Sequence, residues 1–316
     1  MTRLGYQIPN FTYPDVPADR LFPTVVAQAV EAEQSGFDTV LVMDHFYQLP
    51  ILGTPDEAMF ECYTLLSAVA QHTSTVRLSS LVTGNTYRNP TLLAKTVTAL
   101  DIVSGGRGQL GIGAGWFELE HDSLGYEFGT FTDRFEKLEE ALQIILGMLA
   151  GEKPSLEGKW YRVQDALNVP APLSKIPVMI GGGGEKKTLR MVAQYADESN
   201  IICAPGDIGR KLDALAAHCD RLGRDRSEIT VSLQTSACIA PTHDEAVAEL
   251  EAYLERNPAA EIRRATTIVG DPDEVAAHYA DLLATGIDGF TVNAPANGHV
   301  PGRVSLLGQT LAPLIG

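Results

Sequence analysis

The sequence predicts an α/β fold of the TIM-barrel class, in which eight parallel strands close into a barrel, with an insertion near the middle of the chain. Three observations predict it. Apolar runs alternate with helical periodicity along all 316 residues, eight of these runs have strand length, and no long linker rich in Pro, Gly or Ser divides the chain. Eight such repeats favour a closed barrel over an open, doubly wound sheet. We therefore expect one domain over residues 1–316.

The eight expected strands recur along the whole chain. The second, Asp38–Met43 (DTVLVM), is an apolar run of the kind that is buried in a parallel sheet. The third, Val76–Val82, is rich in apolar residues and stops at a polar turn. The others are Leu4–Ile8, Gly108–Ala114, Val178–Ile180, Glu198–Cys203, Ile229–Ile239 and Gly286–Asn293.

Helices are expected between these strands. Thr91–Val103 follows Asn89-Pro90, a pair typical of a helix N-cap and first turn. Asp133–Leu149 has apolar residues on one face, and we interpret its charges from Asp133 to Glu140 as the solvated face. The remaining expected helices are Leu21–Ser35, Phe60–His72, Lys186–Tyr195, Ile208–Leu222, Asp244–Glu255, Pro272–Thr285 and a closing helix near Val304–Leu314.

One segment, Gly151–Lys175, interrupts the alternation. It has prolines towards both ends, no helical period, and Trp160, Tyr161 and Val163 in an alternating pattern. We predict an insertion that contains a short hairpin.

The composition limits the classes of partner and the cellular compartment that we expect. Lys and Arg total 24 against 40 Asp and Glu, a net charge of −16, which argues against nucleic acid and anionic membrane surfaces as partners. The four scattered cysteines lack zinc or redox spacing and indicate a reducing compartment. We recognise no signal peptide and no apolar run of the roughly 18–20 residues that span a membrane. We expect a cytoplasmic protein that acts on a small molecule.

In a TIM barrel the active site lies at the carboxyl ends of the strands. Asp44 and His45 directly follow the second strand, where a carboxylate and an imidazole require partners. A helix cap or a loop hydrogen bond would account for them. We favour a catalytic role at the barrel mouth, because an imidazole exchanges protons near neutral pH.

Two glycine-rich segments also lie at strand ends. Gly181, Gly182, Gly183 and Gly184, followed by Glu185, come between a strand and a helix, where successive N–H groups can form an anion nest. A flexible connection is the alternative. The segment is neither a GxGxxG fingerprint nor a Walker loop. The second segment holds Gly113, Ala114, Gly115 and Trp116, small residues that permit close approach of a planar ring or simply a narrow barrel rim.

Histidines offer no metal site. His72, His121, His218, His243, His278 and His299 lack metal-ligand spacing, and we interpret most of them as surface residues.

Five segments in order resemble the luciferase-like flavin and deazaflavin oxidoreductases, in particular the branch that depends on coenzyme F420. They are MDHF, LVTGNTYRNP, ALDIVSGGRGQLGIGAGW, RFEKLEEAL and PVMIGGGG, and the resemblance covers about residues 4–314. It implies a TIM barrel with a mid-chain insertion, a homodimer, and hydride transfer between coenzyme F420 and a substrate. The alternative cofactor is FMN, in a two-component monooxygenase that receives reduced flavin from a separate reductase. A non-catalytic flavin-binding protein is a third hypothesis.

The resemblance also implies roles for individual residues. Asp44 and His45 match residues near the reactive edge of the ring. Ser80-Leu81 matches a bulge with a non-proline cis peptide that backs the ring. Thr83, Gly115 and the Gly181–Gly184 turn match side-chain and phosphate contacts. Other cofactor contacts are expected at Asn85, Gly113, Ala114, Trp116 and Glu185.

Two departures from the family pattern bear on the substrate. The sugar-phosphate dehydrogenases of the family carry an acidic Glu directly after the glycine that matches Gly115, and a Trp shortly after the Asp-His pair. Trp116 and approximately Leu49 occupy these positions here. This disfavours a sugar phosphate and favours an apolar or aromatic alkene, ketone or imine. The aromatic residues suited to such a pocket, each also explicable as packing, are Phe11, Tyr13, Phe46, Tyr47, Trp116 and Phe117.

Overall fold

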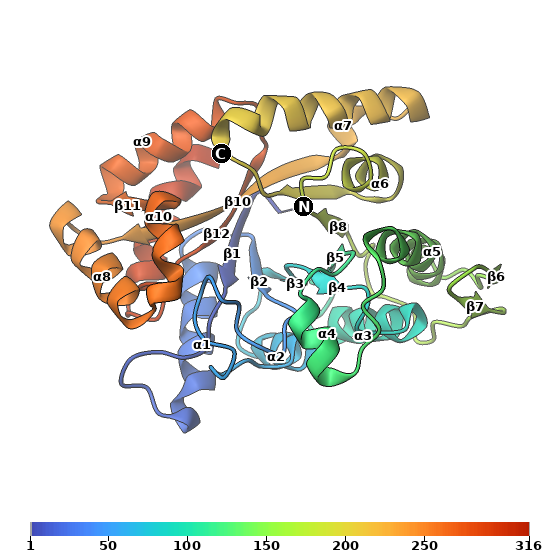
Figure 1. Cartoon of the computed structure of the whole chain (residues 1–316), viewed down its shortest axis with the longest axis horizontal. Coiled ribbons are helices and arrows are strands. Elements are labelled where there is room, and N and C mark those ends of the chain that lie inside the picture. The colour runs from blue at the N-terminus through green and yellow to red at the C-terminus, as the bar shows by residue number, and fades with distance from the viewer. Residues whose placement is uncertain (1, 316) are drawn as a thin grey trace.

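Eight parallel strands form a closed barrel in the computed structural model, which describes residues 2–315 (Figure 1). Neighbouring strands pair in the order β12-β1-β2-β3-β5-β8-β9-β10, and β10 closes the ring because it pairs with both β9 and β12. The predicted TIM barrel and all eight of its expected strands are confirmed. They are β1 (Leu4–Ile8), β2 (Thr39–Val42), β3 (Arg77–Ser80), β5 (Gly108–Gly113), β8 (Val178–Gly181), β9 (Glu198–Ile201), β10 (Thr230–Ile239) and β12 (Gly289–Asn293).

Two short strands extend the sheet beyond the prediction. β4 (Thr83–Gly84) pairs with the end of β5, and β11 (Thr267–Gly270) pairs with the end of β10. β10 accommodates β11 because it is ten residues long. Its segment from Ser232 to Ser236 pairs with β12, and its last residues continue past the barrel to pair with β11.

Helices surround the barrel (Figure 1). They are α1 (Ala18–Gln34), α2 (Cys62–Val69), α3 (Pro90–Val103), α4 (Glu118–Leu124), α5 (Phe131–Leu149), α6 (Thr188–Tyr195), α7 (Ile208–Leu222), α8 (His243–Arg256), α9 (Pro272–Leu283) and α10 (Arg303–Ile315), with 3-10 turns η1 (Pro205–Asp207), η2 (Arg226–Glu228) and η3 (Pro258–Ala265). Residues 2–315 contain ten α-helices, of which nine were expected and α4 was not. Among residues 2–315, no helix has the length and apolar character needed to cross a membrane.

Local sequence signals account for where helices begin. Asn89 caps α3 by accepting a hydrogen bond from the Thr91 N–H at 2.9 Å, as its Asn-Pro pair predicts. Thr130 and Asp133 form a reciprocal capping box at the start of α5. Asp133 therefore does more than contribute to a solvated face, because its carboxylate accepts from the Thr130 backbone.

The insertion forms the expected hairpin, which docks on α5. β6 (Leu156–Glu157) and β7 (Arg162–Val163) pair antiparallel. The Glu140 carboxylate accepts backbone hydrogen bonds from residues 159, 160 and 161 at 2.8–3.0 Å. The hairpin is thereby held beside the loop that follows β4, since Tyr161 lies within 3.5 Å of the Asn85 amide.

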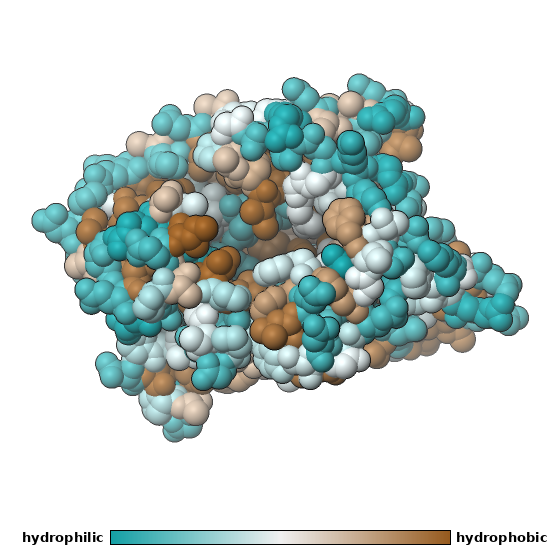
Figure 2. Space-filling model, viewed as in Figure 1, coloured by the Kyte–Doolittle hydropathy of each residue, from teal (hydrophilic) through white to brown (hydrophobic). Residues whose placement is uncertain are grey.

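The face seen in Figure 2 is hollowed at its centre, with apolar side chains along the wall and polar ones around the rim. Large side chains are fully buried between the barrel strands and the helices, as when Tyr6 donates to Gln28 of α1 at 2.9 Å and Phe290 packs edge-on against Tyr279 of α9. Polar residues from different strands pair with one another, as when Asn200 donates to Ser232 and Thr291 at 2.9 and 2.7 Å.

Candidate active site

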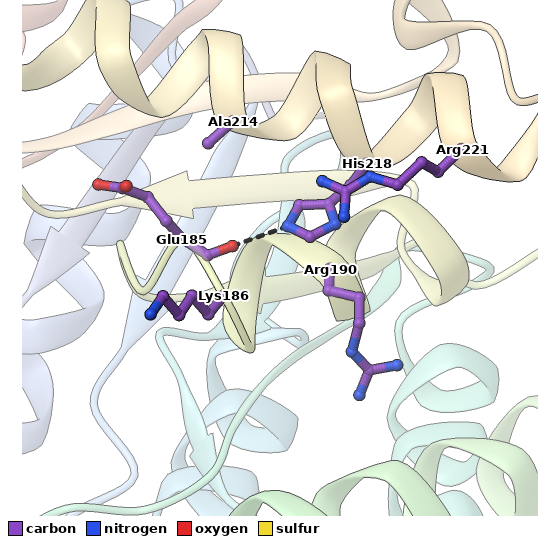
Figure 3. A pocket seen from close by; sticks show the side chains of 6 residues that line it. All are labelled: Glu185, Lys186, Arg190, Ala214, His218 and Arg221. Atoms are coloured by element: carbon purple, nitrogen blue, oxygen red, sulfur yellow. Dashed lines mark hydrogen bonds between the residues drawn. The ribbon is translucent and has the colours of Figure 1, made fainter.

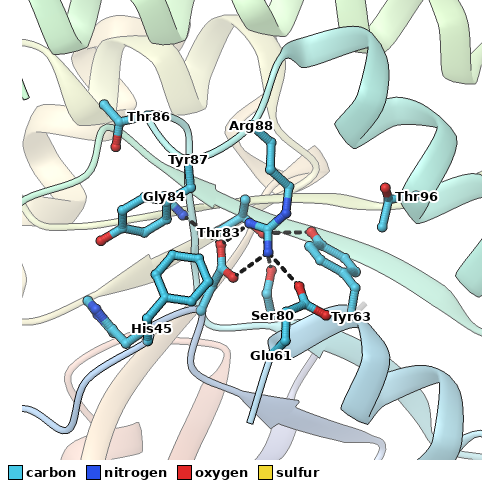
Figure 4. Close-up of polar contacts among 12 residues, drawn as sticks. His45, Glu61, Tyr63, Ser80, Thr83, Gly84, Thr86, Tyr87, Arg88 and Thr96 are labelled. Carbon is cyan, nitrogen blue, oxygen red and sulfur yellow. Dashed lines mark hydrogen bonds and ion pairs between the residues drawn. The ribbon is translucent and has the colours of Figure 1, made fainter. Parts of the chain in front are cut away.

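Asp44 lies just after β2 and forms a buried ion pair with Arg88. Figure 4 labels Arg88 together with Glu61 and Tyr63, which lie close to its guanidinium. The two terminal nitrogens of Arg88 donate to the two carboxylate oxygens of Asp44 at 2.6 and 2.9 Å, and the Gly84 N–H donates to one of them at 3.2 Å. Arg88 also donates to Glu61, the N-cap of α2, at 2.7 Å. This bidentate geometry holds the end of β2 against the turn after β4.

Burial and ion pairing act in opposite directions on the pKa values of Asp44 and Arg88. Burial raises the pKa of the Asp44 carboxyl, while the charge and hydrogen bonds of Arg88 act in the opposite direction. For Arg88, burial lowers the pKa but the neighbouring carboxylates outweigh it, so its pKa lies above the usual value. The guanidinium therefore remains charged, and both Asp44 oxygens are engaged by the protein.

His45 is held by Glu120 from α4. The His45 Nδ1 atom lies 2.9 Å from the Glu120 carboxylate, which is fully buried. The same carboxylate accepts from the backbone N–H groups of Phe46 and Tyr47 at 2.5 and 2.8 Å, and from the Tyr87 hydroxyl. Four donors thus converge on one carboxylate, which fixes both the loop after β2 and the imidazole.

The protonation of Glu120 determines the tautomer of His45. Burial opposes ionisation of Glu120, but the hydrogen bonds from His45, Tyr87 and the Tyr47 backbone outweigh it, and the pKa of Glu120 lies below its usual value. An ionised carboxylate only accepts hydrogen bonds, so Nδ1 of His45 must carry the proton that it donates. The opposite nitrogen, Nε2, has no hydrogen-bond partner among residues 2–315.

Aromatic side chains flank the His45 ring. Trp116 and Phe117 each approach it edge-on with ring centroids 5.8 Å away. Trp116 is 59 % exposed and is free to contact a ligand. Phe11 and Tyr13 are buried, with the Tyr13 hydroxyl bonded to the Asn10 carbonyl at 2.7 Å, so packing accounts for them. Phe46 and Tyr47 are half-buried in the His45 loop.

The expected bulge lies at the end of β3, one residue later than expected. The cis peptide joins Leu81 to Val82 instead of Ser80 to Leu81. Ser80 is the last residue of β3, and its hydroxyl bonds to Thr83 at 2.7 Å and to the Gly111 carbonyl at 2.8 Å. Thr83 in turn bonds to the Tyr63 hydroxyl at 2.6 Å.

Asn85 has an unused acceptor. The residue is 1 % exposed, and its amide nitrogen lies 3.5 Å from the Tyr161 hydroxyl. Its carbonyl oxygen is buried and has no hydrogen-bond partner in the described part of the chain. A buried amide oxygen without a donor is costly, and a bound ligand can supply the donor.

Small residues at the end of β5 are required by neighbouring protein atoms. A Cβ at Gly111 would lie 2.0 Å from the Ser80 carbonyl oxygen, and one at Gly115, where φ is +81°, would lie 2.6 Å from the Thr86 hydroxyl. Packing at the barrel rim therefore accounts for these two glycines. Gly113 pairs with β4, and Ala114 packs against the hydrophobic core.

Two backbone N–H groups in the glycine loop after β8 are available to a ligand. Gly182, with φ +122°, donates its N–H to the Asn200 carbonyl at 2.8 Å. The N–H groups of Gly183 and Gly184 have no acceptor among residues 2–315. Lys211 lies nearby, since a Cβ on Gly183 would be 3.7 Å from its Cε. Glu185 pairs with Lys211 at 2.7 Å and with Arg210, so its carboxylate is neutralised.

Two cavities adjoin these elements. One of about 410 Å³ lies between α6 and α7 on the outer side of the barrel (Figure 3). Its lining includes the cations Lys186, Arg190 and Arg221, and His218, whose Nε2 bonds to the Glu185 carbonyl at 2.8 Å. The other, of about 280 Å³, lies beside the Asp44–Arg88 pair and the hairpin; its lining is Thr86, Tyr87, Arg88, Asn89, Glu127, Lys137, Trp160 and Tyr161.

Glu120 was not predicted from the sequence, and its neighbour His121 does not lie where it was expected. His121 is fully buried, bonded to Thr86 at 2.7 Å and to the Phe117 carbonyl at 2.8 Å, and is therefore not a surface residue. An acidic residue and a histidine soon after a barrel strand are a signal that the strand-end rule could have used. The described residues contain no cluster of side chains arranged to hold a metal ion.

A family model described as luciferase-like monooxygenase matches residues 2–260. The chain belongs to this family. It is therefore an enzyme of the oxidoreductase class. The F420-dependent glucose-6-phosphate dehydrogenase of Segniliparus rotundus is 28 % identical over 306 residues, with 87 % of this chain and 88 % of the relative covered. That of Nocardia farcinica is 27 % identical over 318 residues, with 90 % of this chain and 91 % of the relative covered.

Solved structures share the fold of this luciferase-like enzyme. An F420-dependent secondary alcohol dehydrogenase in complex with an F420–acetone adduct superimposes with a TM-score of 0.83 at 19 % identity, covering 100 % of this chain and 99 % of that one. The oxygenating constituent of 3,6-diketocamphane monooxygenase from Pseudomonas putida, in complex with FMN, gives 0.75 at 17 % identity, covering 99 % and 98 %.

Proposed function

We propose that this enzyme transfers a hydride between coenzyme F420 and a small organic substrate of the alkene, ketone or imine type, with His45 as the proton-handling group. The observation that carries the proposal is the bond between His45 Nδ1 and the buried Glu120. It leaves Nε2 without a partner among residues 2–315 at the carboxyl end of β2, where barrel enzymes have their active sites.

The residues at the barrel mouth fit such a cofactor. When bound, coenzyme F420 supplies a ring carbon that accepts or releases a hydride, and the protein contributes binding, orientation and electrostatics. The free N–H groups of Gly183 and Gly184, with Lys211 beside them, suit a phosphate. The Leu81–Val82 bulge would back the ring, and the Asn85 carbonyl oxygen would accept one of its donors.

His45 has a defined proton route in this arrangement. Because Nδ1 donates to Glu120, the lone pair of Nε2 can take a proton from a substrate hydroxyl or amine as hydride leaves the substrate carbon. In the reverse direction Nε2 returns that proton to the carbonyl oxygen or imine nitrogen. Trp116 and Phe117 flank the imidazole ring of His45, and these apolar surroundings suit an apolar substrate.

The relatives support F420 over FMN, and a titration tests the choice. The relatives from Segniliparus rotundus and Nocardia farcinica are F420-dependent dehydrogenases. Purified protein would be titrated with F420 and with FMN while cofactor fluorescence is recorded. We expect saturable binding of F420; micromolar FMN binding without F420 binding would instead support the two-component monooxygenase, an alternative that the FMN complex of a structural neighbour favours.

A non-catalytic flavin carrier is the remaining alternative. It needs no proton-handling group, and the four donors gathered on Glu120 to orient His45 argue against it. Turnover of alkenes, ketones and imines with the bound cofactor tests this point. Bound cofactor that no compound of the panel oxidises or reduces would support the carrier.

We further infer a homodimer in a reducing, cytoplasmic compartment, with a separate enzyme that reduces the cofactor. Exposed Leu92 and Val103 on α3 and Val169 in the insertion support a contact surface, and Lys95 joins α3 to the Val169 carbonyl at 2.6 Å. All four cysteines are free thiols, which fits that compartment. Light scattering on the purified protein measures the oligomeric state.

A further inference from the structure

Two consecutive arginines in η3 have opposite surroundings. Arg264 is exposed and pairs with the carboxylates of Glu251 and Glu261. Arg263 is 9 % exposed and has no ion pair with any carboxylate among residues 2–315. Its pKa is lowered by burial, and the only group that acts against this is the Tyr253 hydroxyl. The chain has thus buried the arginine that lacks a counter-ion.

Hydrogen bonds orient Arg263 without neutralising it. Its Nε donates to the Ile51 carbonyl at 2.8 Å, and Nη1 donates to the Ser236 hydroxyl at 2.7 Å. The other terminal nitrogen, Nη2, has no acceptor in the described part of the chain. Two neutral acceptors therefore fix a guanidinium whose positive charge is left uncompensated.

Arg263 lies at the carboxyl end of the barrel. Ser236 is in register with Asn293, the last residue of β12, and donates to its side chain at 2.6 Å. Asn293 donates to Gln7 at 2.8 Å, and Gln7 lies 3.4 Å from the carbonyl of Leu81. This network runs from Arg263 across the mouth to the bulge after β3. Ile51 belongs to the same loop as His45.

A buried cation without a counter-ion lowers the stability of the folded protein. Removing a charge from water carries a large free-energy penalty unless a nearby opposite charge offsets it. A guanidinium with a free terminal nitrogen suits a carboxylate or phosphate oxygen better than any neutral group. An anion that enters the mouth would form the missing ion pair.

We propose that Arg263 binds an anionic group of the substrate, a carboxylate or a phosphate, at the side of the mouth formed by β10, β12 and the loop after β2. The assignment rests on the proposed function, since it specifies the substrate as a ketone, imine or alkene that carries an acidic group. It reconciles the apolar surroundings of His45 with a charged ligand, because the reacting carbon and the anionic group contact different residues.

A charge-matched pair of probes tests the assignment on the full chain without cofactor. Binding of benzoate and of benzamide, which has a similar shape but no charge, would be measured by calorimetry and by the shift in melting temperature. We expect the native protein to prefer benzoate. Arg263→Gln should weaken benzoate binding about 10- to 100-fold and leave benzamide binding unchanged.

Matched variants distinguish a role of Arg263 in anion binding from a role that is limited to holding the loop after β2. Arg264→Gln, next in the chain, should keep the native preference for benzoate. Arg263→Lys retains the charge but not the two terminal nitrogens of the guanidinium. It should keep part of the preference for benzoate even if Arg263→Gln does not fold. If Arg263→Gln or Arg263→Lys binds benzoate as the native protein does, or if the native protein does not distinguish the probes, the assignment is overturned. Because no turnover is involved, this result is independent of whether F420 is the cofactor.

Discussion

His45 and Glu120 form a hydrogen-bonded pair, 2.9 Å from Nδ1 to carboxylate, although they follow different strands of the barrel. His45 comes three residues after the end of β2, whereas Glu120 lies in α4, which follows β5. The barrel brings the two together because β2, β3 and β5 are consecutive neighbours in the sheet. The imidazole is therefore oriented by a residue of another βα unit.

Replacing Glu120 should impair hydride transfer more than cofactor binding. Glu120→Gln removes the charge that determines the tautomer of His45, and loss of an oriented proton-handling group typically lowers the rate about 10²–10⁴-fold. Single-turnover hydride transfer and cofactor affinity would be measured on the same preparation. Glu118→Gln, an exposed change on the same helix, is the control and should behave as the native protein.

His45→Ala should lower turnover by a similar factor while the melting temperature and the cofactor affinity stay near native values. The reason is that His45 is half-buried and its loop retains the Phe46 and Tyr47 bonds to Glu120. Stopped-flow measurement of cofactor oxidation state gives the rate. A stable variant with native hydride transfer would remove His45 from the mechanism.

Breaking the Asp44–Arg88 pair from one side should destabilise the protein strongly. Arg88→Met leaves the Asp44 carboxylate buried without its counter-ion, which typically costs about 3–5 kcal/mol of unfolding free energy. The double variant Arg88→Met with Asp44→Asn should recover part of that loss, because no buried charge remains. Urea unfolding of the single and double variants measures it; additive losses would show that the pair is not coupled.

Stability should fall in acid partly through Glu120. Its pKa in the folded protein lies below the unfolded value of about 4.3, so its contribution is complete above that pH and is lost as the pH falls through the folded value. Denaturation curves between neutral pH and about pH 3 would show the decline. In Glu120→Gln this part of the decline should be absent, so the stability difference between native and variant protein should shrink with acidification.

Altering the glycine loop should affect cofactor affinity first. Gly182→Ala places a side chain at φ +122°, a conformation that non-glycine residues rarely adopt, and should displace the N–H groups of Gly183 and Gly184. We expect a higher Kd for the cofactor and near-native single-turnover rates at saturation. Gly209→Ala in α7, where a Cβ would meet nothing within 4 Å, is the matched control.

Elements with long, regular patterns were predictable from sequence, and short ones were not. The barrel strands and the amphipathic α5 follow from apolar periodicity. α4 has seven residues and β11 has four, too few for a period to be evident. Their absence from the prediction also hid Glu120, because a residue in an unrecognised helix cannot be placed at the mouth. That the chain forms one domain stays a prediction.

The strand-end rule located candidate residues but not their partners. It placed Asp44, His45 and the glycine loop at the mouth, since each directly follows a strand. Arg88 and Arg263 were not identified because their contacts depend on how distant segments pack. The cis peptide was placed one residue early, because a resemblance locates a bulge without fixing its register.

The loop between β2 and α2 is held from three directions. Glu120 binds its backbone at Phe46 and Tyr47, Arg263 binds the Ile51 carbonyl, and the Tyr253 hydroxyl binds the Leu52 carbonyl at 2.9 Å. A swinging motion of this loop would break all three attachments at once, so it is poorly suited to serve as a gate. Ligands would then enter and leave the barrel at the opposite rim, where the N–H groups of Gly183 and Gly184 have no acceptor among residues 2–315 and Ile202, after β9, is 66 % exposed.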